Sequence, residues 1–388
     1  MKKLISILGS TGSVGLSTLK IIDQKRNNYE FLLLSANRNF KLICKQIKKY
    51  KPKYFIITDK KIFEKAKKKF NTSKTLLLND FKDINLKKKN DLSILAIPGL
   101  AGLQPTIKMI KLSKKILIAN KESIICGWNI IKKNAKAYKT SIIPVDSEHF
   151  SIFQLLKKYE LKHINKIYIT ASGGPFLNYS FNKLKNVKPK EALKHPKWKM
   201  GKKISIDSST MMNKIFELIE AQKLFDIPKN KLDILIHPES LVHAIVELKN
   251  GLVQFIYHET SMIIPIANAI YDGKININEF LKIKKKKNYI GIRNLNFRAV
   301  KQRNFPVVKI KNRINEYPST PIIINACNEI LVDQFLQKKI PFLSISKIIM
   351  GILNDKNYRK YAIKTPKNIN QIFKIDLWAR GKTKELIN

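Results

Sequence analysis

The chain has 388 residues, a length that predicts two or three domains rather than one. Hydrophobic residues make up 44% of it, but no apolar run reaches the ~18 residues that a membrane-spanning helix needs, so we expect no membrane partner. The first residues, Met1-Lys2-Lys3, lead directly into an apolar run without a targeting segment, which predicts a cytoplasmic protein. The widely spaced cysteines Cys44, Cys126 and Cys327 exclude a disulfide framework and a cysteine-based zinc site.

Lysine and arginine number 75 against 28 aspartate and glutamate residues, a formal net charge of +47. A charge of this size is typical of proteins that bind nucleic acid or anionic membranes. The cations, however, are spread along the whole chain in short runs such as Lys67 to Lys69, without interleaved aromatic residues. The abundance of Lys, Ile and Asn favours compositional drift over a selected nucleic-acid surface. We therefore expect no specific nucleic-acid partner, only a long-range field that attracts anionic substrates.

Residues 1–150 alternate strand-like apolar runs with polar stretches of helix length, the pattern of βαβ units on a parallel sheet. Most of these runs are continuously apolar, as expected of strands covered on both faces. The predicted strands are Leu4 to Leu8, Glu30 to Ala36, Tyr54 to Thr58, Leu92 to Ile97, Lys115 to Ala119 and Ser141 to Val145. The pattern predicts an α/β protein whose first domain, residues 1–150, is Rossmann-like.

Residues 151–275 predict a central α+β domain. Its expected elements are a strand at Lys166 to Thr170, a Pro- and Lys-rich loop at about 178–203, a helix at about Ser209 to Phe225, and strands at Leu232 to Ile236, Ala244 to Lys249 and Leu252 to His258. Asn250-Gly251 between the last two strands is a strong hairpin signal. One face of this sheet would be free to build a site or a dimer interface.

The remaining residues divide into a weakly periodic segment and a helical one. Residues 276–304 are rich in Lys and Asn and are predicted to form a linker. Residues 305–388 are predicted to form a small helical C-terminal domain, with Ile322 to Gln337 as its clearest helix.

Gly9, Gly12 and Gly15 are spaced by three directly after the first predicted strand and before a helix. In this context the loop brings backbone N–H groups and a helix N-terminus to a pyrophosphate, although a plain tight turn would show the same glycines. An NAD site would place an acid after the second strand, whereas Arg38 lies there instead. A guanidinium suits the 2′-phosphate of NADP(H), and the alternative for Arg38 is an ordinary solvated cation.

Three carboxylate residues, Asp146, Glu148 and Glu217, are candidate ligands of a hard divalent cation. Asp146 and Glu148 end a predicted strand at positions i and i+2, so they would share a side while Ser147 faces away if the strand geometry persists. Glu217 shares a predicted helix face with Asn213 and Lys214. Such a set suits Mg²⁺ or Mn²⁺, but spacing does not show that Glu217 meets the other two. Ordinary caps and surface charges remain the alternative for these acids.

Eight motifs follow one another along the chain: Gly9 to Gly15, Asn120-Lys121-Glu122-Ser123, Val145 to His149, Ala171 to Phe176, His195 to Gly201, Asp207 to Lys214, His237-Pro238-Glu239-Ser240 and Asn325 to Glu329. Together, in this order, they resemble the 1-deoxy-D-xylulose 5-phosphate reductoisomerase family over essentially the whole chain. The family's enzymes depend on NADPH and a divalent metal and belong to the non-mevalonate isoprenoid pathway. The resemblance therefore implies conversion of 1-deoxy-D-xylulose 5-phosphate, a sugar phosphate, to 2-C-methyl-D-erythritol 4-phosphate by metal-assisted rearrangement and hydride transfer.

The resemblance also implies a role for each matching residue. The metal, Mn²⁺, Mg²⁺ or Co²⁺, would be held by Asp146, Glu148 and Glu217. The substrate would contact Lys121, Ser147, Glu148, Ser172, His195, Ser208, Asn213, Lys214 and Glu217, and Lys121, Glu148 and His195 would be catalytic. The NADPH contacts would be Thr11, Gly12, Ser13, Val14, Arg38, Asn39, Asn120, Glu122 and Gly201. Lys214 would serve the substrate phosphate and not the metal, the segment 178–203 with His195 and Trp198 would form a flexible lid, and the protein would be a homodimer.

Two departures from the family pattern affect a single residue and a six-residue segment. Ile215 stands where the family usually has glycine after Asn-Lys, and Thr260 to Pro265 replaces the common Pro-Asp-Met-Arg-x-Pro. Neither removes a metal ligand or a phosphate contact, so we expect an active enzyme. The alternatives are an NADP-dependent polyol-phosphate dehydrogenase and a basic nucleic-acid-binding protein without catalysis.

Overall fold

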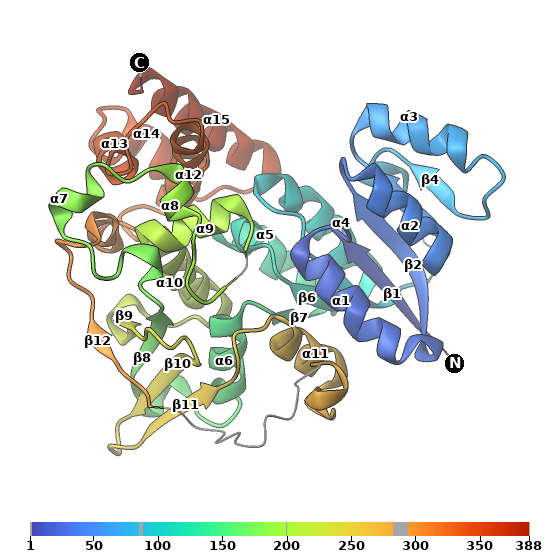
Figure 1. Ribbon diagram of the computed structural model, residues 1–388, viewed down its shortest axis with the longest axis horizontal. Coiled ribbons are helices and arrows are strands. Elements are labelled where there is room, and N and C mark those ends of the chain that lie inside the picture. The colour runs from blue at the N-terminus through green and yellow to red at the C-terminus, as the bar shows by residue number, and fades with distance from the viewer. Residues whose placement is uncertain (1, 85–87, 199, 282–293, 388) are drawn as a thin grey trace. The chain divides into compact units, whose positions relative to one another are not determined.

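The computed structural model describes residues 2–84, 88–198, 200–281 and 294–387 (Figure 1). The chain forms two compact units. Unit 1 comprises Met1–Ser123, Asn129–Asp146 and Ser261–Tyr289, and unit 2 comprises Ile124–Trp128, Ser147–Thr260 and Ile290–Asn388. These units do not coincide with the three domains expected from the sequence, because the helical C-terminal segment shares unit 2 with the central sheet. The domain boundaries expected at residues 150, 275 and 304 stay a prediction.

Unit 1 is built on a parallel sheet, as predicted. Among the described residues it has seven strands in the order β4-β3-β2-β1-β5-β6-β7, and each neighbouring pair is parallel. In the central strand β1, the successive residues Ile5, Ser6 and Ile7 are all fully buried, so both faces of the sheet are covered. The strands are β1 (Lys3–Leu8), β2 (Tyr29–Ala36), β3 (Tyr54–Ile57), β4 (Leu76–Leu78), β5 (Asn90–Leu95), β6 (Ser113–Ile118) and β7 (Ser141–Pro144).

The helices of unit 1 begin at residues that suit helix N-termini. Asn39 and Asp59 cap α2 and α3, since their side chains accept the backbone N–H groups of Leu42 and Ile62. The helices are α1 (Ser13–Gln24), α2 (Phe40–Tyr50), α3 (Lys60–Lys69), α4 (Leu103–Leu112), α5 (Lys121–Tyr138), whose middle is grouped with unit 2, and α11 (Ile263–Tyr271). Helices α1 and α11 contact each other. Short 3₁₀ turns lie at Arg26–Asn28, Phe81–Asp83, Leu100–Gly102 and Ile277–Glu279.

Unit 2 contains a mixed sheet. Its order among the described residues is β11-β10-β8-β9-β12, with β8 and β9 parallel and the other neighbours antiparallel. The strands are β8 (Ile164–Ala171), β9 (Leu232–Ile236), β10 (Val242–Leu248), β11 (Val253–Tyr257) and β12 (Arg298–Ala299). Gly251 has φ +87° between β10 and β11, which confirms the predicted hairpin.

The helices of unit 2 include those of the C-terminal segment, which is helical as predicted. Helix α12 packs against α13 and α15 and also contacts α9, and α6 contacts β10 and β11. The helices are α6 (Ser147–Leu156), α7 (Phe181–Leu184), α8 (Pro189–Ala192), α9 (Lys202–Thr210), α10 (Met212–Phe225), α12 (Thr320–Leu336), α13 (Ser344–Leu353), α14 (Tyr358–Ala362) and α15 (Ile369–Glu385). The 3₁₀ turns of unit 2 lie at Leu161–His163, Gly174–Phe176, Lys229–Lys231 and Pro306–Asn312.

Two expectations about segments between the main elements were wrong. The segment 178–203 is not wholly loop, because α7 and α8 lie in it and Leu184 and Ala192 are buried. The helix predicted at 209–225 begins earlier and is broken at Met211, whose φ of +70° separates α9 from α10.

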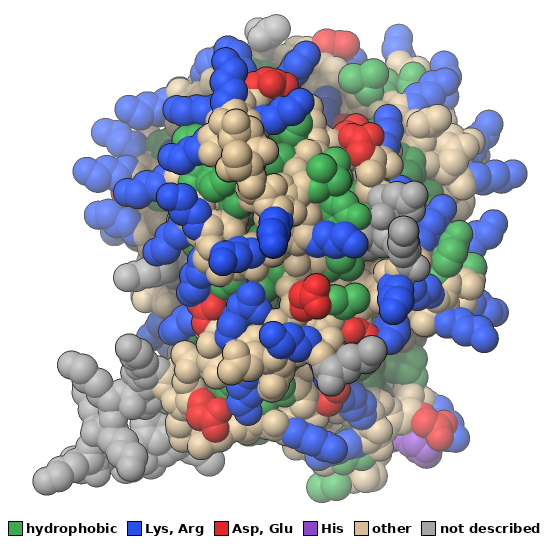
Figure 2. All heavy atoms as spheres, turned by 90° about the vertical axis from the view of Figure 1, so that its right-hand side faces the viewer, with side chains coloured by type: hydrophobic (Ala, Val, Ile, Leu, Met, Phe, Trp, Pro, Cys, Tyr) green, Lys and Arg blue, Asp and Glu red, His purple; other side chains and the backbone are tan. Residues whose placement is uncertain are grey.

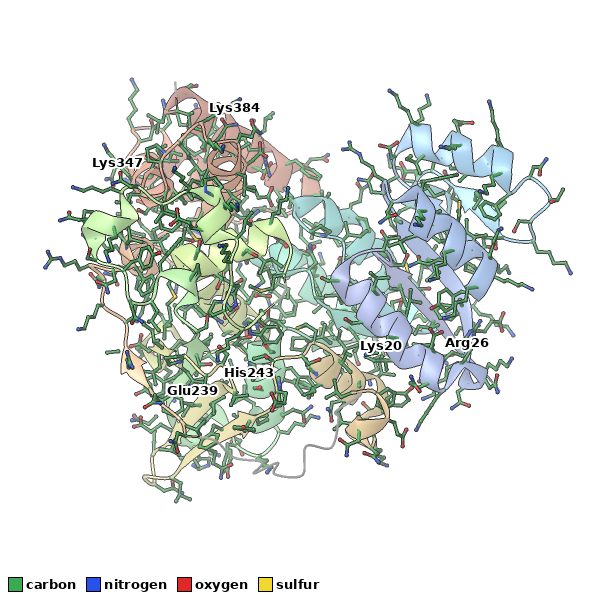
Figure 3. The ribbon with its side chains drawn as sticks, in the orientation of Figure 1. Lys20, Arg26, Glu239, His243, Lys347 and Lys384 are labelled. Carbon is green, nitrogen blue, oxygen red and sulfur yellow. The ribbon has the colours of Figure 1, made fainter. Side chains whose placement is uncertain are left out.

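The predicted linker at 276–304 is partly structured where it is described. Strand β12 pairs with β9, and the Phe297 ring stacks on His237 with a centroid separation of 4.7 Å. The Asn296 side chain donates to Glu239, a residue labelled in Figure 3. Residues 282–293 of this segment lie outside the described residues, as does Lys199 of the predicted lid. Among the helices of the described residues, we find none long and apolar enough to cross a membrane.

Candidate active site and cofactor cavity

Three carboxylates converge. Asp146 follows β7, Glu148 lies in the first turn of α6, and Glu217 lies in α10. One oxygen from each lies within 4.8 Å of the others, and the Glu217 side chain is almost wholly buried. The expected extension of the strand through Glu148 was wrong, because β7 ends at Pro144 and α6 begins at Ser147. The tight turn into a helix still brings Asp146 and Glu148 together, and the oxygen donor set fits a hard divalent cation.

Lysine side chains contact all three carboxylates. The Lys214 Nζ lies 2.6 Å from Glu148 Oε1 and 2.5 Å from Glu217 Oε2, and the Lys121 Nζ lies 3.3 Å from Asp146 Oδ2. The side chains of both lysines are about nine-tenths buried. Three like charges at this spacing repel one another, and the two ammonium groups offset that repulsion. Lys214 therefore serves the carboxylates directly, a contact that the sequence did not predict.

Other groups hold the carboxylates in place. Ser147 Oγ donates to Glu148 Oε2 at 2.5 Å, and the Asn213 amide donates to Glu217 Oε1. His149 is fully buried, with its Nε2 3.0 Å from the Glu217 carbonyl oxygen and its Nδ1 3.8 Å from Glu220 Oε2. Asn213, Lys214 and Glu217 lie on one face of the helix, as predicted, because the side chains of Asn213 and Lys214 both donate to the Glu217 carboxylate.

His195 is a neutral imidazole whose tautomer follows from its hydrogen bonds. Its Nδ1 accepts the backbone N–H groups of Lys197 and Trp198, at 3.1 and 2.9 Å, and so carries no proton. The proton is on Nε2, which donates to Ser172 Oγ at 3.0 Å. Burial, and then the charge of Lys214, lower the pKa of His195 to about 4. His195 therefore presents a hydrogen-bond donor to the serine that follows β8.

Trp198 is anchored by a pair of stacked imidazoles. Its ring meets His243 of β10 edge-on at 6.1 Å, and His243 stacks on His258 at 3.9 Å. Both histidines are buried, and burial lowers the pKa of His258. Trp198 thus rests on a buried aromatic surface.

The predicted phosphate contacts lie on neighbouring segments of unit 2. Ser172 follows β8, Ser208 is in the last turn of α9, and Asn213 is in the first turn of α10. The residue before Ser208, Asp207, is buried and accepts hydrogen bonds from Asn328 Nδ2 at 2.7 Å and Lys203 Nζ at 3.0 Å. Asn328 belongs to α12, so the C-terminal helices hold the end of α9 that carries Ser208.

The glycine-rich turn lines a cavity of about 690 Å³ in unit 1. A Cβ atom at Gly9 would lie 2.5 Å from the Ala96 carbonyl oxygen, and one at Gly15 would lie 2.4 Å from the Gly9 carbonyl oxygen. The two positions therefore exclude side chains, as the dinucleotide-binding turn requires. The cavity is lined by Gly9, Thr11, Gly12, Ala36, Asn37, Thr58, residues 79–82, residues 96–98, Ala101, Gln104, Pro105 and Lys108.

The other predicted cofactor contacts have structural partners. Arg38 Nε lies 3.1 Å from Asp59 Oδ2, while most of the Arg38 side chain is exposed. Asn39 caps α2, and Asn120 caps α5 while its amide donates to the Ile97 and Gly99 carbonyls and to Glu122. Ser13 and Val14 form the first turn of α1. Gly201 lies in unit 2, where it is the N-cap of α9.

Sequence reasoning missed one wall of the cavity. Residues 79–82 follow β4, a three-residue strand too short to show periodicity, and residues 96–98 follow β5. A usable signal was present, since ligands of parallel sheets bind at the carboxyl ends of the strands and β5 neighbours β1.

The sequence matches the model of 1-deoxy-D-xylulose 5-phosphate reductoisomerase over residues 5–127, and two models of its C-terminal domains over residues 142–225 and 258–382. A 1-deoxy-D-xylulose 5-phosphate reductoisomerase from Pelagibacter ubique is 48% identical over 378 residues, covering 96% of each chain. The chain belongs to the 1-deoxy-D-xylulose 5-phosphate reductoisomerase family. Another reductoisomerase, from a Wolbachia of Drosophila simulans, is 42% identical over 90% of this chain and 89% of its own.

Solved reductoisomerase structures share the fold over the whole chain. The Zymomonas mobilis enzyme in complex with NADPH matches with a TM-score of 0.88 and 33% identity, covering 100% of both chains. A reductoisomerase in complex with NADPH, fosmidomycin and magnesium matches with a TM-score of 0.91 and 31% identity, covering 99% of this chain and 98% of its own. The family, the α/β fold and the resemblance stated from the motifs are thereby confirmed.

Proposed function

We propose that this protein converts 1-deoxy-D-xylulose 5-phosphate to 2-C-methyl-D-erythritol 4-phosphate with NADPH and a divalent cation, in non-mevalonate isoprenoid biosynthesis. The observation that carries the proposal is the convergence of Asp146, Glu148 and Glu217, in a chain that belongs to the reductoisomerase family. A simple reductase has no need of three carboxylates around a hard cation. This feature favours the reductoisomerase over the polyol-phosphate dehydrogenase alternative.

The carboxylates would hold Mg²⁺, Mn²⁺ or Co²⁺. When bound, such a cation polarises vicinal oxygens of the substrate while charge develops on them. Lys121, beside Asp146, and Ser147, beside Glu148, would contact the substrate backbone. Both side chains are buried and held by a neighbouring carboxylate, which limits their freedom before substrate binds.

The substrate phosphate would be held by Ser172, Ser208, Asn213 and Lys214. Two hydroxyls and an amide provide directional donors, and one ammonium provides charge. The Nε2 proton of His195 orients the Ser172 hydroxyl, because the serine oxygen accepts it. The serine proton is then free to point away from the imidazole, toward an acceptor such as phosphate.

NADPH would bind at the cavity of unit 1. The Gly9 to Val14 turn and the N-terminus of α1 would receive the pyrophosphate, and Arg38 would receive the 2′-phosphate. Movement of the lid segment, residues 178–203, would cover the bound substrate and exclude water from the aldehyde intermediate. His195 and Trp198 lie in this segment.

We further propose that the protein is a cytoplasmic homodimer. Strand β11 is an edge of the unit 2 sheet, and Val253 and Phe255 on it are half exposed, as is Leu252 beside it. An exposed apolar edge strand is a pairing surface that a second copy would cover. Sedimentation of the wild type should give a dimer and of Phe255→Lys a monomer, whereas a wild-type monomer would contradict the proposal.

The test of the reaction is NADPH consumption with 1-deoxy-D-xylulose 5-phosphate after chelation of metals, with and without added Mn²⁺. We expect consumption only with Mn²⁺, and 2-C-methyl-D-erythritol 4-phosphate as the product in the NMR spectrum. Consumption that is independent of metal, or an unrearranged polyol phosphate as product, would contradict the proposal.

A further inference from the structure

The ammonium group of Lys214 contacts two of the three carboxylates that are proposed to bind the metal. It lies 2.6 Å from Glu148 Oε1 and 2.5 Å from Glu217 Oε2, and both carboxylates belong to the set within 4.8 Å. The side chains are buried, with exposed fractions of 9% for Lys214, 13% for Glu148 and 1% for Glu217. Water therefore screens these charges poorly. A divalent cation bound by the same oxygens would meet a like charge at contact distance.

Lys214 also has a second group within its electrostatic reach. Its charge contributes to the lowered pKa of His195, whose Nε2 donates to Ser172 Oγ. Asn213, the neighbour of Lys214 in the chain, is another proposed phosphate contact. A lysine side chain has a flexible four-carbon stem that can place its ammonium at different positions. The charge of Lys214 therefore acts both on the carboxylates, which it contacts, and on His195, which bonds to the proposed phosphate contact Ser172.

From this geometry we propose that Lys214 is a counterion that metal and phosphate share. Its ammonium neutralises Glu148 and Glu217, a divalent cation displaces it, and the phosphate of the substrate receives it. This inference rests on the proposed function and deepens it. Metal alone must compete with the ammonium, while metal together with a phosphate monoester leaves each charge with an opposite partner. The two ligands must then strengthen each other's binding, because linkage is reciprocal.

The test measures Mn²⁺ affinity by calorimetry with the full-length protein. Lys214→Gln should bind Mn²⁺ alone about tenfold more tightly than the wild type, since the competing cation is gone. Ethyl phosphate, which has no further oxygen donors for the metal, should tighten Mn²⁺ binding to the wild type by about fivefold or more and should not affect Lys214→Gln. Lys347→Gln is the matched control, because Lys347 is an exposed residue of α13 whose loss removes the same charge (Figure 3).

An Mn²⁺ affinity of Lys214→Gln equal to or weaker than that of the wild type would overturn the inference, as would equal coupling to ethyl phosphate in both proteins. A measurement on the wild type covers the case in which the variant does not fold. The ¹⁵Nζ signal of Lys214 should shift on saturation with diamagnetic Mg²⁺ alone, and an unchanged signal would also overturn the inference. Neither measurement involves turnover, so active wild-type enzyme without coupling would contradict only the role of Lys214.

Discussion

At the scale of single residues, Arg38 is the proposed determinant of cofactor choice. Its guanidinium contacts Asp59, the residue that caps α3. Arg38→Asp should raise the Michaelis constant for NADPH about tenfold or more, because a charge-assisted contact to the 2′-phosphate is lost. The Michaelis constant for NADH should change little, because NADH has no 2′-phosphate. Steady-state kinetics with both cofactors measure this.

Asp59→Asn is the control for the position of the guanidinium. Asparagine keeps the cap of α3 but not the ion pair with Arg38. We therefore expect a smaller rise in the Michaelis constant for NADPH than in Arg38→Asp. An unaltered ratio of the two Michaelis constants in Arg38→Asp would mean that Arg38 does not select NADPH.

His195 should remain neutral throughout the physiological range. Its pKa is about 4 in the folded protein, lowered first by burial and then by Lys214, against an ordinary value of 6.5. The folded state therefore binds fewer protons than the unfolded state below pH 6.5, so this residue costs stability as the pH falls from 6.5 toward 4 and has no such effect above.

Imidazole ¹⁵N shifts of His195 at pH 6 should show the Nε2–H tautomer. A midpoint near 6.5 for His195 would contradict the hydrogen-bond pattern at Nδ1.

The site could be predicted in composition but not in all of its contacts. Helical spacing placed Asn213, Lys214 and Glu217 on one face, and the motifs identified the three carboxylates. The contact of Lys214 with Glu148 depends on how α6 packs near α10, and this is a tertiary arrangement that spacing does not contain. Asp146 and Glu148 were predicted to share one side of an extended strand, whereas a helix begins at Ser147. The sequence does not distinguish the two cases, because an acid after Ser147 is compatible with a strand end and with the first turn of a helix.

At the scale of elements, the bond from α12 to α9 connects the C-terminal helices to the proposed phosphate contact Ser208. Asn328→Leu should leave the buried Asp207 carboxylate without its amide partner, a loss of about 1–3 kcal/mol of stability. If the bond positions Ser208, the Michaelis constant for 1-deoxy-D-xylulose 5-phosphate should rise more than kcat falls. Denaturant unfolding and steady-state kinetics measure the two effects.

Gln337→Leu provides a comparison, since Gln337 follows α12 and is exposed. It should change neither stability nor the Michaelis constant appreciably. Asn328→Gln keeps an amide and should recover part of the substrate affinity. Equal losses of affinity in Asn328→Leu and Asn328→Gln would indicate a packing role alone.

Most strands could be predicted from the sequence, but some of the shortest elements could not. The continuous apolar runs identified most strands of the parallel sheet within a few residues of their ends. Strand β4 and helices α7 and α8 have three or four residues, too few for an apolar pattern to repeat twice. The break at Met211 was missed because a left-handed backbone at a non-glycine residue has no sequence signal there.

At the scale of the whole molecule, Figure 2 shows Lys and Arg side chains spread over the visible face, with Asp and Glu among them. On that face the cations do not form a stripe. If the charge of +47 is mostly drift, binding to duplex DNA should be weak, independent of sequence and lost steeply as salt rises. Fluorescence anisotropy with two unrelated duplexes at low and physiological salt measures this, and tight selective binding at physiological salt would contradict it.

The spread of exposed lysines also affects how the protein can form a crystal lattice. An ordered lysine loses up to about 2 kcal/mol of side-chain conformational entropy, so a lattice contact through several of them is unfavourable. Lys67, Lys68 and Lys69 in the last turn of α3 are all exposed and suit replacement by alanine. Alanine has the higher helix propensity, but cations at a helix C-terminus each contribute about 0.3–1 kcal/mol to helix stability. Surface-entropy reduction at α3 would therefore exchange some stability of that helix for a surface that packs more readily against its neighbours.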